Sequence, residues 1–549
     1  MDLQEHYKRI YWYAISVVMV LKLALVGWWP LLARMHERTD SVLFIRRAIA
    51  LLEGDWLGST YDYAILMKGP MTSFWIAATN YLGWPVNFAR EALYLVACLL
   101  ALKALSLICR SKWALFLFFC FLVFLPAASA YGPLAALFRE SIHLPLVLAV
   151  QALLINLFIK YAQGTKVYFY EAGLLGVFLL AFFLNREEAP WIFPQLAWFV
   201  LGAFSVAWWR YHQENTQINS LDLLKIMLVP TVIILAGVEW ISNKNYEEYG
   251  IDAVLEINRP EFKSAYKGLM RIKPDSPVNS GALSPDVIQK LLSLPRGSEL
   301  NVPPFSSGRG LDAMRVPWKF RSAAQKAGYY KQGGAAVLEF YGSLGEELDA
   351  ACEREKYACR PVLFGAIPIF DGFWSKAFSA LSPKVAEIVT LYGITVSLEG
   401  YPSYGDYNYR RNLSLLTSAP IALTAQDREE LPKYYTKMKR KKTSVLERIL
   451  AFYQKVLPVL ASLSLVVFVM ALVRVVRTKT VGVQEFLMTG LFGALLTQLL
   501  IFSLLSASGL STSTRLYFNS YPVLLLFVAI SLIYLGQWVS GLLRGKSRG

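Results

Sequence analysis

Residues 69–83 read GPMTSFWIAATNYLG, and the topology of the whole chain depends on whether this run crosses a membrane. The run is apolar, but it is only 15 residues long and includes Thr72, Thr79 and Asn80. A helix needs about 20 predominantly apolar residues to span the hydrocarbon core, which is roughly 30 Å thick. We therefore predict that residues 69–83 form a juxtamembrane helix that lies in the interface.

The composition of the rest of the chain predicts a membrane protein. Of its 549 residues, 55% are hydrophobic and 17% are charged. Soluble domains contain roughly 45–50% apolar residues, so water is not the only solvent of this chain. Ten runs are long and apolar enough to be spanning helices, and they lie near residues 11–32, 91–109, 113–131, 144–160, 168–184, 191–209, 222–241, 449–473, 482–505 and 520–540.

The basic residues predict the orientation. If residues 69–83 do not cross, the Lys and Arg of the short loops fall on the same side as Lys8 and Arg9. Cytoplasmic loops carry an excess of Lys and Arg, so this side is predicted to be cytoplasmic. If residues 69–83 crossed, every later loop would change side and the rule would fail at most of them. The run KMKRKK at 437–442 stands against this orientation, because it falls outside.

The predicted fold is a polytopic α-helical membrane protein with three parts. It has about ten transmembrane helices, juxtamembrane helices in the first outer loop (33–90), and a soluble α+β extracytoplasmic domain. The parts are an N-terminal transmembrane module (1–242), the soluble domain (243–447) and the C-terminal transmembrane helices (448–549).

The soluble domain contains two amphipathic patterns and a pair of cysteines. The patterns predict helices near 285–293 and 335–352, and strands are expected near 391–398. Cys352 and Cys359 lie in the polar run CEREKYAC. They either close a short disulfide, if this region faces an oxidising compartment, or stay as two free thiols.

The net charge of +16 would suit a nucleic acid. Many of the lysines and arginines adjoin apolar spans, however, where anionic lipid headgroups attract them. We therefore expect the lipid bilayer, and no nucleic acid, as a partner. The first outer loop is also basic, which a phosphate-bearing ligand would explain; its basic residues are Arg34, Arg38, Arg46, Arg47, Lys68 and Arg90.

Asp40 is the candidate catalytic residue of this loop. It follows the first span by a few residues and precedes an amphipathic stretch, 41–52, so it is expected where membrane meets water. A carboxylate held there can act as a general base toward a hydroxyl or amine. The alternative is that Asp40 caps the N-terminus of the following helix, and the local sequence alone favours this alternative.

Two further outer segments bring ionisable groups to the same level. Arg139, Glu140 and His143 lie at the mouth of the fourth span, and Arg186 and Glu187 follow the fifth. Arginine suits phosphate because its planar fork donates two parallel hydrogen bonds. Ordinary ion pairs at helix ends are the alternative.

A metal site is a further hypothesis. His36 and His143, together with Asp40 and Glu140, could ligate a divalent cation, since such ions accept carboxylate and imidazole together. No tight ligand spacing supports this set, so no metal is assigned and cofactors stay open.

The order of these features resembles the GT-C superfamily of integral-membrane glycosyltransferases, which includes the protein O-mannosyltransferases and the lipid A aminoarabinose transferases. The resemblance covers about the first 210 residues. Its pieces follow the order of the chain and are Asp40, the run 51–58, Tyr61-Asp62, Lys68-Gly69-Pro70 and Arg139-Glu140. Two departures leave the acceptor class and metal dependence open. Ser41 stands where the family often has a second acidic residue, and Gly69-Pro70 replaces the usual Pro-Pro.

The resemblance implies transfer of a sugar from a polyprenyl-phosphate-linked donor to an extracytoplasmic glycan, lipid or protein, with inversion. This is a reaction of glycan biosynthesis at the cell envelope. It implies a bacterial inner membrane, with the active site and the 243–447 domain on the periplasmic side. Asp40 would be the catalytic base. Arg139 and Glu140 would match the second-loop residues that bind the lipid phosphate or the acceptor. Stabilising the leaving phosphate is an electrostatic task, for which Lys68, Arg186 and Arg515 are further candidates beside Arg139. Arg515 fits equally well as an interfacial anchor with Tyr517. The candidates for binding the acceptor or substrate are Glu140, Asp62, Tyr61 and Glu187.

Three other functions fit parts of the sequence. A polymerase or ligase of lipid-linked polysaccharide has a similar layout, but the chain has no histidine after His212, which argues against that chemistry. A transporter is expected to contain inverted repeats and helices interrupted near mid-membrane, and neither pattern is apparent. A non-catalytic scaffold that presents the 243–447 domain would tolerate loss of Asp40.

Overall fold

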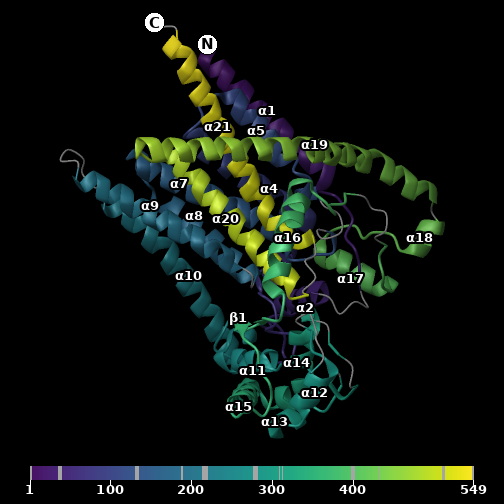
Figure 1. The fold of residues 1–549 in the computed structure, drawn as a ribbon. Coiled ribbons are helices and arrows are strands. Elements are labelled where there is room, and N and C mark those ends of the chain that lie inside the picture. Colours follow the sequence, from purple (N-terminus) through teal and green to yellow (C-terminus); the bar gives the residue numbers. More distant parts are fainter. Residues whose placement is uncertain are drawn as a thin grey trace.

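The computed structural model is predominantly helical (Figure 1). It describes residues 3–34, 40–129, 135–186, 189–212, 220–275, 282–303, 305–307, 310–311, 313–396, 402–430, 432–509 and 514–546.

The N-terminal part places one helix at its centre. The helix α7 packs against α4, α8, α9 and α21, and its side chains are buried on every face because the sequence is apolar all round. The elements of this part are α1 (Leu3–Val26), α2 (Asp40–Glu53), α3 (Met71–Tyr81), α4 (Val86–Ser106), α5 (Lys112–Val123), η1 (Pro126–Ser129), α7 (Glu140–Gln163), α8 (Phe169–Asn185), η2 (Ala189–Ile192), α9 (Phe193–His212) and α10 (Ser220–Tyr249).

The predicted run 69–83 forms a helix. With 11 residues, α3 is about 16 Å long, roughly half the thickness of the hydrocarbon core. It packs beside α2, the amphipathic helix of the same loop. The helix is therefore too short to span, as its sequence predicts.

Within the described residues, seven helices are long and apolar enough to cross a membrane. They lie at Arg9–Val26, Glu140–Gln163, Pro190–Trp209, Leu221–Tyr249, Thr443–Thr478, Val483–Ala507 and Leu516–Gly541. The predicted spans near 113–131 and 168–184 correspond to the shorter apolar helices α5 and α8. The chain is an integral membrane protein, and the total of about ten crossings stays a prediction.

The segment after α10 builds a helical body with its own apolar core, centred on Phe262, Phe320 and Tyr341. Its helices α11 and α15 approach closely, because a Cβ atom on Gly268 would lie only 2.6 Å from Cβ of Leu348. The elements are η3 (Glu256–Asn258), α11 (Pro260–Arg271), α12 (Pro285–Leu292), α13 (Pro295–Ser298), η4 (Phe305–Ser307), η5 (Ala313–Arg315), α14 (Val316–Lys326), η6 (Tyr329–Gln332) and α15 (Gly334–Glu353). The helices predicted near 285–293 and 335–352 are confirmed as α12 and α15.

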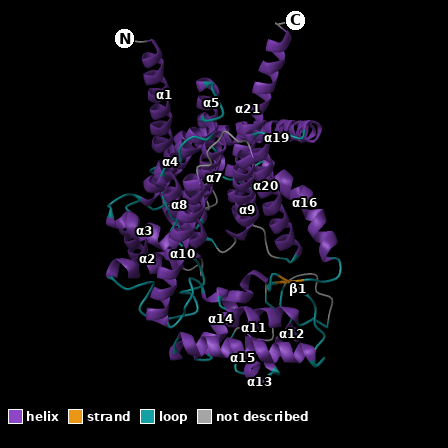
Figure 2. Ribbon diagram, turned by 90° about the vertical axis from the view of Figure 1, so that its left-hand side faces the viewer, coloured by secondary structure: helices purple, strands orange, loops and turns teal. Residues whose placement is uncertain are grey.

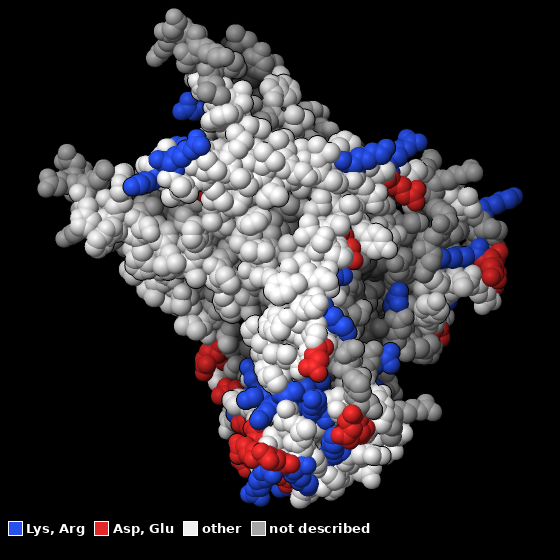
Figure 3. Space-filling model, in the orientation of Figure 1, with Lys and Arg blue, Asp and Glu red and all other residues white. Residues whose placement is uncertain are grey.

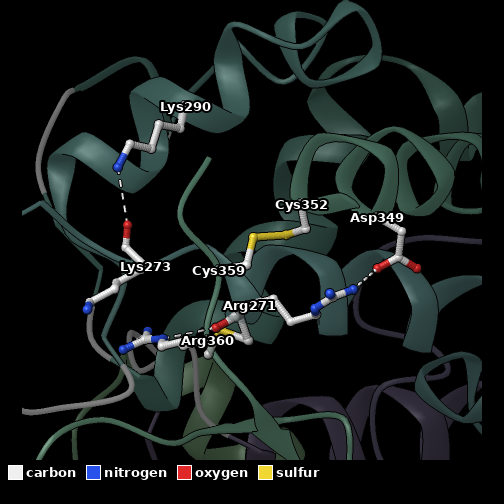
Figure 4. Close-up of a disulfide and its surroundings, with 8 residues drawn as sticks. Arg271, Lys273, Lys290, Asp349, Cys352, Cys359 and Arg360 are labelled. Carbon is white, nitrogen blue, oxygen red and sulfur yellow. Dashed lines mark hydrogen bonds and ion pairs between the residues drawn. A yellow bond between two sulfur atoms is a disulfide. The ribbon is translucent and has the colours of Figure 1, made fainter. Parts of the chain in front are cut away.

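Cys352 and Cys359 form a disulfide that closes the turn after α15 (Figure 4). Beside it, Arg271 of α11 pairs with Asp349 of α15 at 2.5 Å. The isolated bridge between Ile272 and Cys359 ties the same turn to the end of α11. Of the two alternatives left open by the sequence, the structure therefore has the disulfide.

The described part of residues 243–447 has regular secondary structure that is almost entirely helical, unlike the α+β domain that the sequence predicts. Its strands are a two-residue pair, β1 (Val362–Leu363) and β2 (Ile367–Pro368), joined antiparallel. The strand expected near 391–398 is absent from the described residues 391–396. Leu391 and Gly393 have positive φ angles, 54° and 73°, which turn the chain out of an extended conformation.

Two later helices of the outer segment pack away from this body. Ile388 at the end of α16 (Phe373–Val389) belongs to the same apolar core as the central helices, and α16 lies along α20. Leu413 of α17 (Tyr407–Thr417) packs with Phe44 and Ile76 of the first outer loop. The separate core therefore extends over residues 262–351.

The C-terminal part returns to the bundle. Its elements are α18 (Ala425–Glu430), α19 (Pro432–Thr478), α20 (Val483–Ala507), η7 (Thr514–Asn519) and α21 (Ser520–Lys546). Both termini lie at the end of the molecule opposite the body made by α11 to α15 (Figure 2). On the face drawn in Figure 3, charged side chains gather over that body and are sparse over the bundle, as expected for a part that lies in lipid.

Candidate active site

Asp40 and Arg139 come together where α2 and α7 begin. Asp40 is the first residue of α2, and Arg139 directly precedes α7. The Asp40 Oδ2 and Arg139 Nη2 atoms are 3.8 Å apart, with the two side chains 28% and 7% exposed. The start of a helix favours a carboxylate, so the capping interpretation of Asp40 also fits its position. The ion pair with Arg139 is a contact that capping alone does not require.

The segment that follows α8, which holds Asn185 and Arg186, lies against the segment at the start of α7, which holds Arg139 and Glu140. Arg186 Nη1 and Glu140 Oε1 are 3.4 Å apart, and both side chains are almost fully buried. The neighbouring Asn185 donates a hydrogen bond from Nδ2 to the Arg139 carbonyl at 3.1 Å. It also accepts one at Oδ1 from Thr72 Oγ1 at 2.9 Å. Asn185 therefore joins the first, second and third outer segments.

The Lys68-Gly69-Pro70 segment packs on the end of α8. A Cβ atom on Gly69 would lie 2.0 Å from the Leu184 carbonyl oxygen, so only glycine fits this approach. The buried Arg47 donates hydrogen bonds from both Nη atoms to the Lys68 carbonyl, at 2.9 and 3.0 Å. These contacts fix the Lys68-Gly69 backbone against Leu184 and Asn185, the residues that precede Arg186. We refer to Asp40, Lys68, Arg139, Glu140 and Arg186 as the outer-loop cluster.

Asp62 lies elsewhere and holds its own loop. Its carboxylate accepts two hydrogen bonds from Arg46, at 2.8 and 3.2 Å. It also accepts bonds from the backbone N–H groups of Ala64 and Ile65, at 2.8 and 3.0 Å. These contacts explain Asp62 as the residue that shapes the turn, and substrate binding by Asp62 stays a prediction.

Tyr61 joins the 33–90 loop to the helical body made by α11 to α15. Its ring stacks on Tyr249 and packs against Tyr330, with centroids 5.2 Å away in each case, and its hydroxyl donates to Glu256. Burial, together with the Glu256 carboxylate, raises the pKa of Tyr61 and of Tyr330 well above the usual value for a phenol. Substrate binding by Tyr61 likewise stays a prediction.

The ion pair at the centre of this contact is not predicted from the sequence. Arg321 donates from Nε and Nη2 to the two Glu256 oxygens, at 2.8 and 2.7 Å, and both side chains are fully buried. Tyr330 donates to the same carboxylate at 2.7 Å. We refer to Tyr61, Glu256, Arg321 and Tyr330 as the docking network. Glu256 is 195 positions from Tyr61 and 65 from Arg321, so no local pattern joins these residues.

A second missed group lies inside the bundle. Lys22 Nζ is 3.5 Å from Glu91 Oε2 and donates to Ser129 Oγ at 2.6 Å, and both ionisable side chains are buried. Arg90 pairs with the other oxygen of Glu91 at 2.7 Å. Ionisable residues at such positions are costly and therefore suggest function. The signal in the sequence was a lysine within the first apolar run.

The remaining predicted residues are placed only in part. His36 and Glu187 lie outside the described residues, and for Arg515 only the backbone is described. His143 is buried and stacks on Phe182 at 4.9 Å, on the side of α7 that meets α8. Within the described ranges, no group of three or more His, Cys, Asp or Glu side chains is arranged to hold a metal ion.

Comparisons with known proteins do not assign this chain to a family. No protein-family model matches it, and no curated protein matches it significantly. Two solved structures of ArnT from Cupriavidus metallidurans, one bound to undecaprenyl phosphate and one in the apo state, are similar to it at 13% sequence identity and a TM-score of 0.28. Each match covers 96% of this chain, and 77% and 78% of the two ArnT chains respectively. A likeness of this size identifies no family, so the side chains of the outer-loop cluster are the basis for a function.

Proposed function

We propose that this membrane protein is a glycosyltransferase of the GT-C type, which transfers a sugar from a polyprenyl-phosphate-linked donor to an extracytoplasmic acceptor. One observation carries the proposal. The partly exposed Asp40 carboxylate lies 3.8 Å from the buried Arg139 guanidinium, beside the hydrogen bonds by which Asn185 joins the three loops. The sequence resemblance of the same loops to the GT-C superfamily supports it.

In this mechanism Asp40 is the general base. Its carboxylate accepts the proton of an acceptor hydroxyl or amine as that atom attacks the anomeric carbon of the donor sugar. The new bond forms on one face while the bond to the phosphate oxygen breaks on the other, so the configuration inverts. The polyprenyl phosphate leaves with the electron pair. Arg139 positions the carboxylate through the ion pair.

The cations of the outer-loop cluster suit the leaving phosphate. Three cationic and two carboxylate side chains leave this set with a formal excess of one positive charge. Fixed positive groups that face developing negative charge stabilise a transition state without reorganisation. Arg186 is buried and paired with Glu140 at 3.4 Å, so it positions that carboxylate. Arg139 makes a longer pair with Asp40, 3.8 Å, and is proposed both to position that carboxylate and, with Lys68, to contact the phosphate.

Transfer of radiolabelled sugar tests the proposal. The purified protein in detergent is supplied with a polyprenyl-phosphate-linked donor extract and a panel of acceptors. Wild type is expected to transfer label, and Asp40→Asn is expected to be slower by about 10²–10⁴-fold, the usual contribution of a general base. Asp55→Asn is the matched control, because Asp55 is an exposed carboxylate of the same loop beyond the other end of α2.

Two results would overturn the proposal. In one, a well-folded Asp40→Asn protein, checked by size-exclusion chromatography, transfers label as fast as wild type. In the other, wild type is inactive with a donor and acceptors that a known GT-C enzyme accepts.

A further inference from the structure

A large cavity lies between α5 and α21, at the end of the bundle away from the outer-loop cluster. Its volume is about 860 Å³, within the range of roughly 300–1,000 Å³ that is typical of ligand pockets. The walls are mainly apolar side chains, among them Leu115, Phe118, Phe121, Leu460 and Leu532. Arg110, Ser111, Gln537 and Ser540 form its polar part.

A second cavity of about 450 Å³ adjoins the first and shares Cys109, Arg110 and Gln537 with it. Polar side chains line much of this one, and they include Gln163, Gln484 and Tyr534. Gln537 lines both cavities and so lies between them. Its Nε2 donates a hydrogen bond to the Ile108 carbonyl at 2.8 Å. Its Oε1 accepts from Gln484 at 3.1 Å. An apolar chamber and a polar chamber therefore meet at Arg110.

The charge at this junction is positive. Arg110 is exposed and lines both cavities, and among the described residues none forms an ion pair with it. The other cation of the polar cavity, Arg474, is paired with Glu485. An anionic group at the junction would therefore meet one arginine whose charge is not compensated.

We propose that these joined cavities bind one anionic phospholipid. An acyl chain lies in the apolar cavity, the phosphate contacts Arg110, and a hydroxyl-bearing headgroup occupies the polar cavity. The bilayer already solvates acyl chains as well as an apolar wall does, so the chain adds little selectivity. Basic pockets between transmembrane helices are known to recognise anionic headgroups. The headgroup charge therefore decides which lipid is bound.

This site is separate from the proposed transfer site. The 21-residue helix α4 begins at Val86, next to the first outer loop, and ends at Ser106, close to Arg110. A helix of that length is about 30 Å long, so the two sites lie near opposite ends of the bundle. The lipid site therefore does not depend on the proposed glycosyltransferase function.

Native mass spectrometry of the full chain in detergent tests the site, with phosphatidylglycerol and phosphatidylcholine of identical acyl chains as probes. Wild type is expected to prefer phosphatidylglycerol about fivefold, the effect of one basic residue near a charged lipid. Arg110→Gln is expected to remove the preference. Lys112→Gln is the matched control, because Lys112 is an exposed basic residue two positions away that lines neither cavity.

A second variant tests the apolar chamber. Gly536 lines the larger cavity on α21, and a Cβ atom there would meet nothing within 4 Å. The Cβ of Gly536→Leu therefore has open space around it, and the longer side chain extends into the cavity, so this variant is expected to lower the retention of both lipids. The proposal is overturned if wild type retains both lipids equally, if Lys112→Gln loses the preference as fully as Arg110→Gln, or if Gly536→Leu retains lipid as wild type does.

Discussion

Replacing Arg321 with methionine should destabilise the docking network by about 3–5 kcal/mol. Arg321 and Glu256 are fully buried and joined by two hydrogen bonds, at 2.8 and 2.7 Å. Methionine keeps part of the volume but leaves the Glu256 charge with only the neutral donors Tyr330 and Tyr61. Breaking a buried ion pair from one side costs this much because the remaining charge is uncompensated.

Hydrogen exchange of the full-length protein in detergent measures the loss. A loss of 3–5 kcal/mol speeds exchange of the amides in α14 and α15 by about 140- to 3,700-fold, since each 1.4 kcal/mol is a factor of ten. Arg271→Met is the matched control, because its pair with Asp349 is partly exposed. Such pairs contribute about 0–1 kcal/mol.

The double variant Arg321→Met with Glu256→Gln removes both charges. It is expected to recover a large part of the lost protection, because replacing a whole buried pair by neutral groups costs much less than breaking it. The reasoning is refuted if Arg321→Met exchanges no faster than Arg271→Met. It is equally refuted if the double variant is less protected than the single one.

Two other predictions follow from the same contacts. Gly69→Ala should slow sugar transfer by about 100-fold, the cost of a displacement near 1 Å, because its Cβ would lie 2.0 Å from the Leu184 carbonyl oxygen. Gly173→Ala on α8, where a Cβ meets nothing within 4 Å, should transfer normally, and equal rates for both variants would contradict the prediction. Alkaline pH should destabilise the docking network, because burial and a neighbouring carboxylate raise the pKa of Tyr61 and Tyr330 above that of a free phenol. The folded state therefore holds the two phenol protons more tightly than the unfolded chain does. The stability that these phenols contribute is complete below about pH 10, the pKa of a free phenol, and is lost as the pH rises through their folded-state pKa values. The thermal midpoint should fall over that range, less so in Tyr61→Phe, and an equal fall in both proteins would refute this assignment.

The features that the sequence predicts well are local or set by length. The helix α3 follows from a run too short to span, and α12 and α15 follow from amphipathic periodicity. The approach of Asp40 to Arg139 agrees with the predicted topology, which places the ends of their apolar runs on one side of the membrane. Hydropathy predicts where each apolar run ends, and the bias of basic residues predicts which of these ends lie on the same side of the membrane.

The features that the sequence does not predict depend on distant partners. The hydrogen bond of Tyr61 to Glu256 joins residues 195 positions apart. The contacts of Asp62 with Arg46 and with its own turn are not signalled by its motif either. The strand expected near 391–398 does not form over residues 391–396, because Leu391 and Gly393 have positive φ angles. A leucine carries no sequence signal for that conformation.

The most direct test of the central claim is to separate donor binding from transfer in Asp40→Asn. Equilibrium binding of a radiolabelled polyprenyl-phosphate sugar and single-turnover transfer are measured on the same preparation. If Asp40 is the base, donor affinity is unchanged and the single-turnover rate falls by about 10²–10⁴-fold. A loss of donor affinity with an unchanged single-turnover rate would contradict the account and make Asp40 a binding residue.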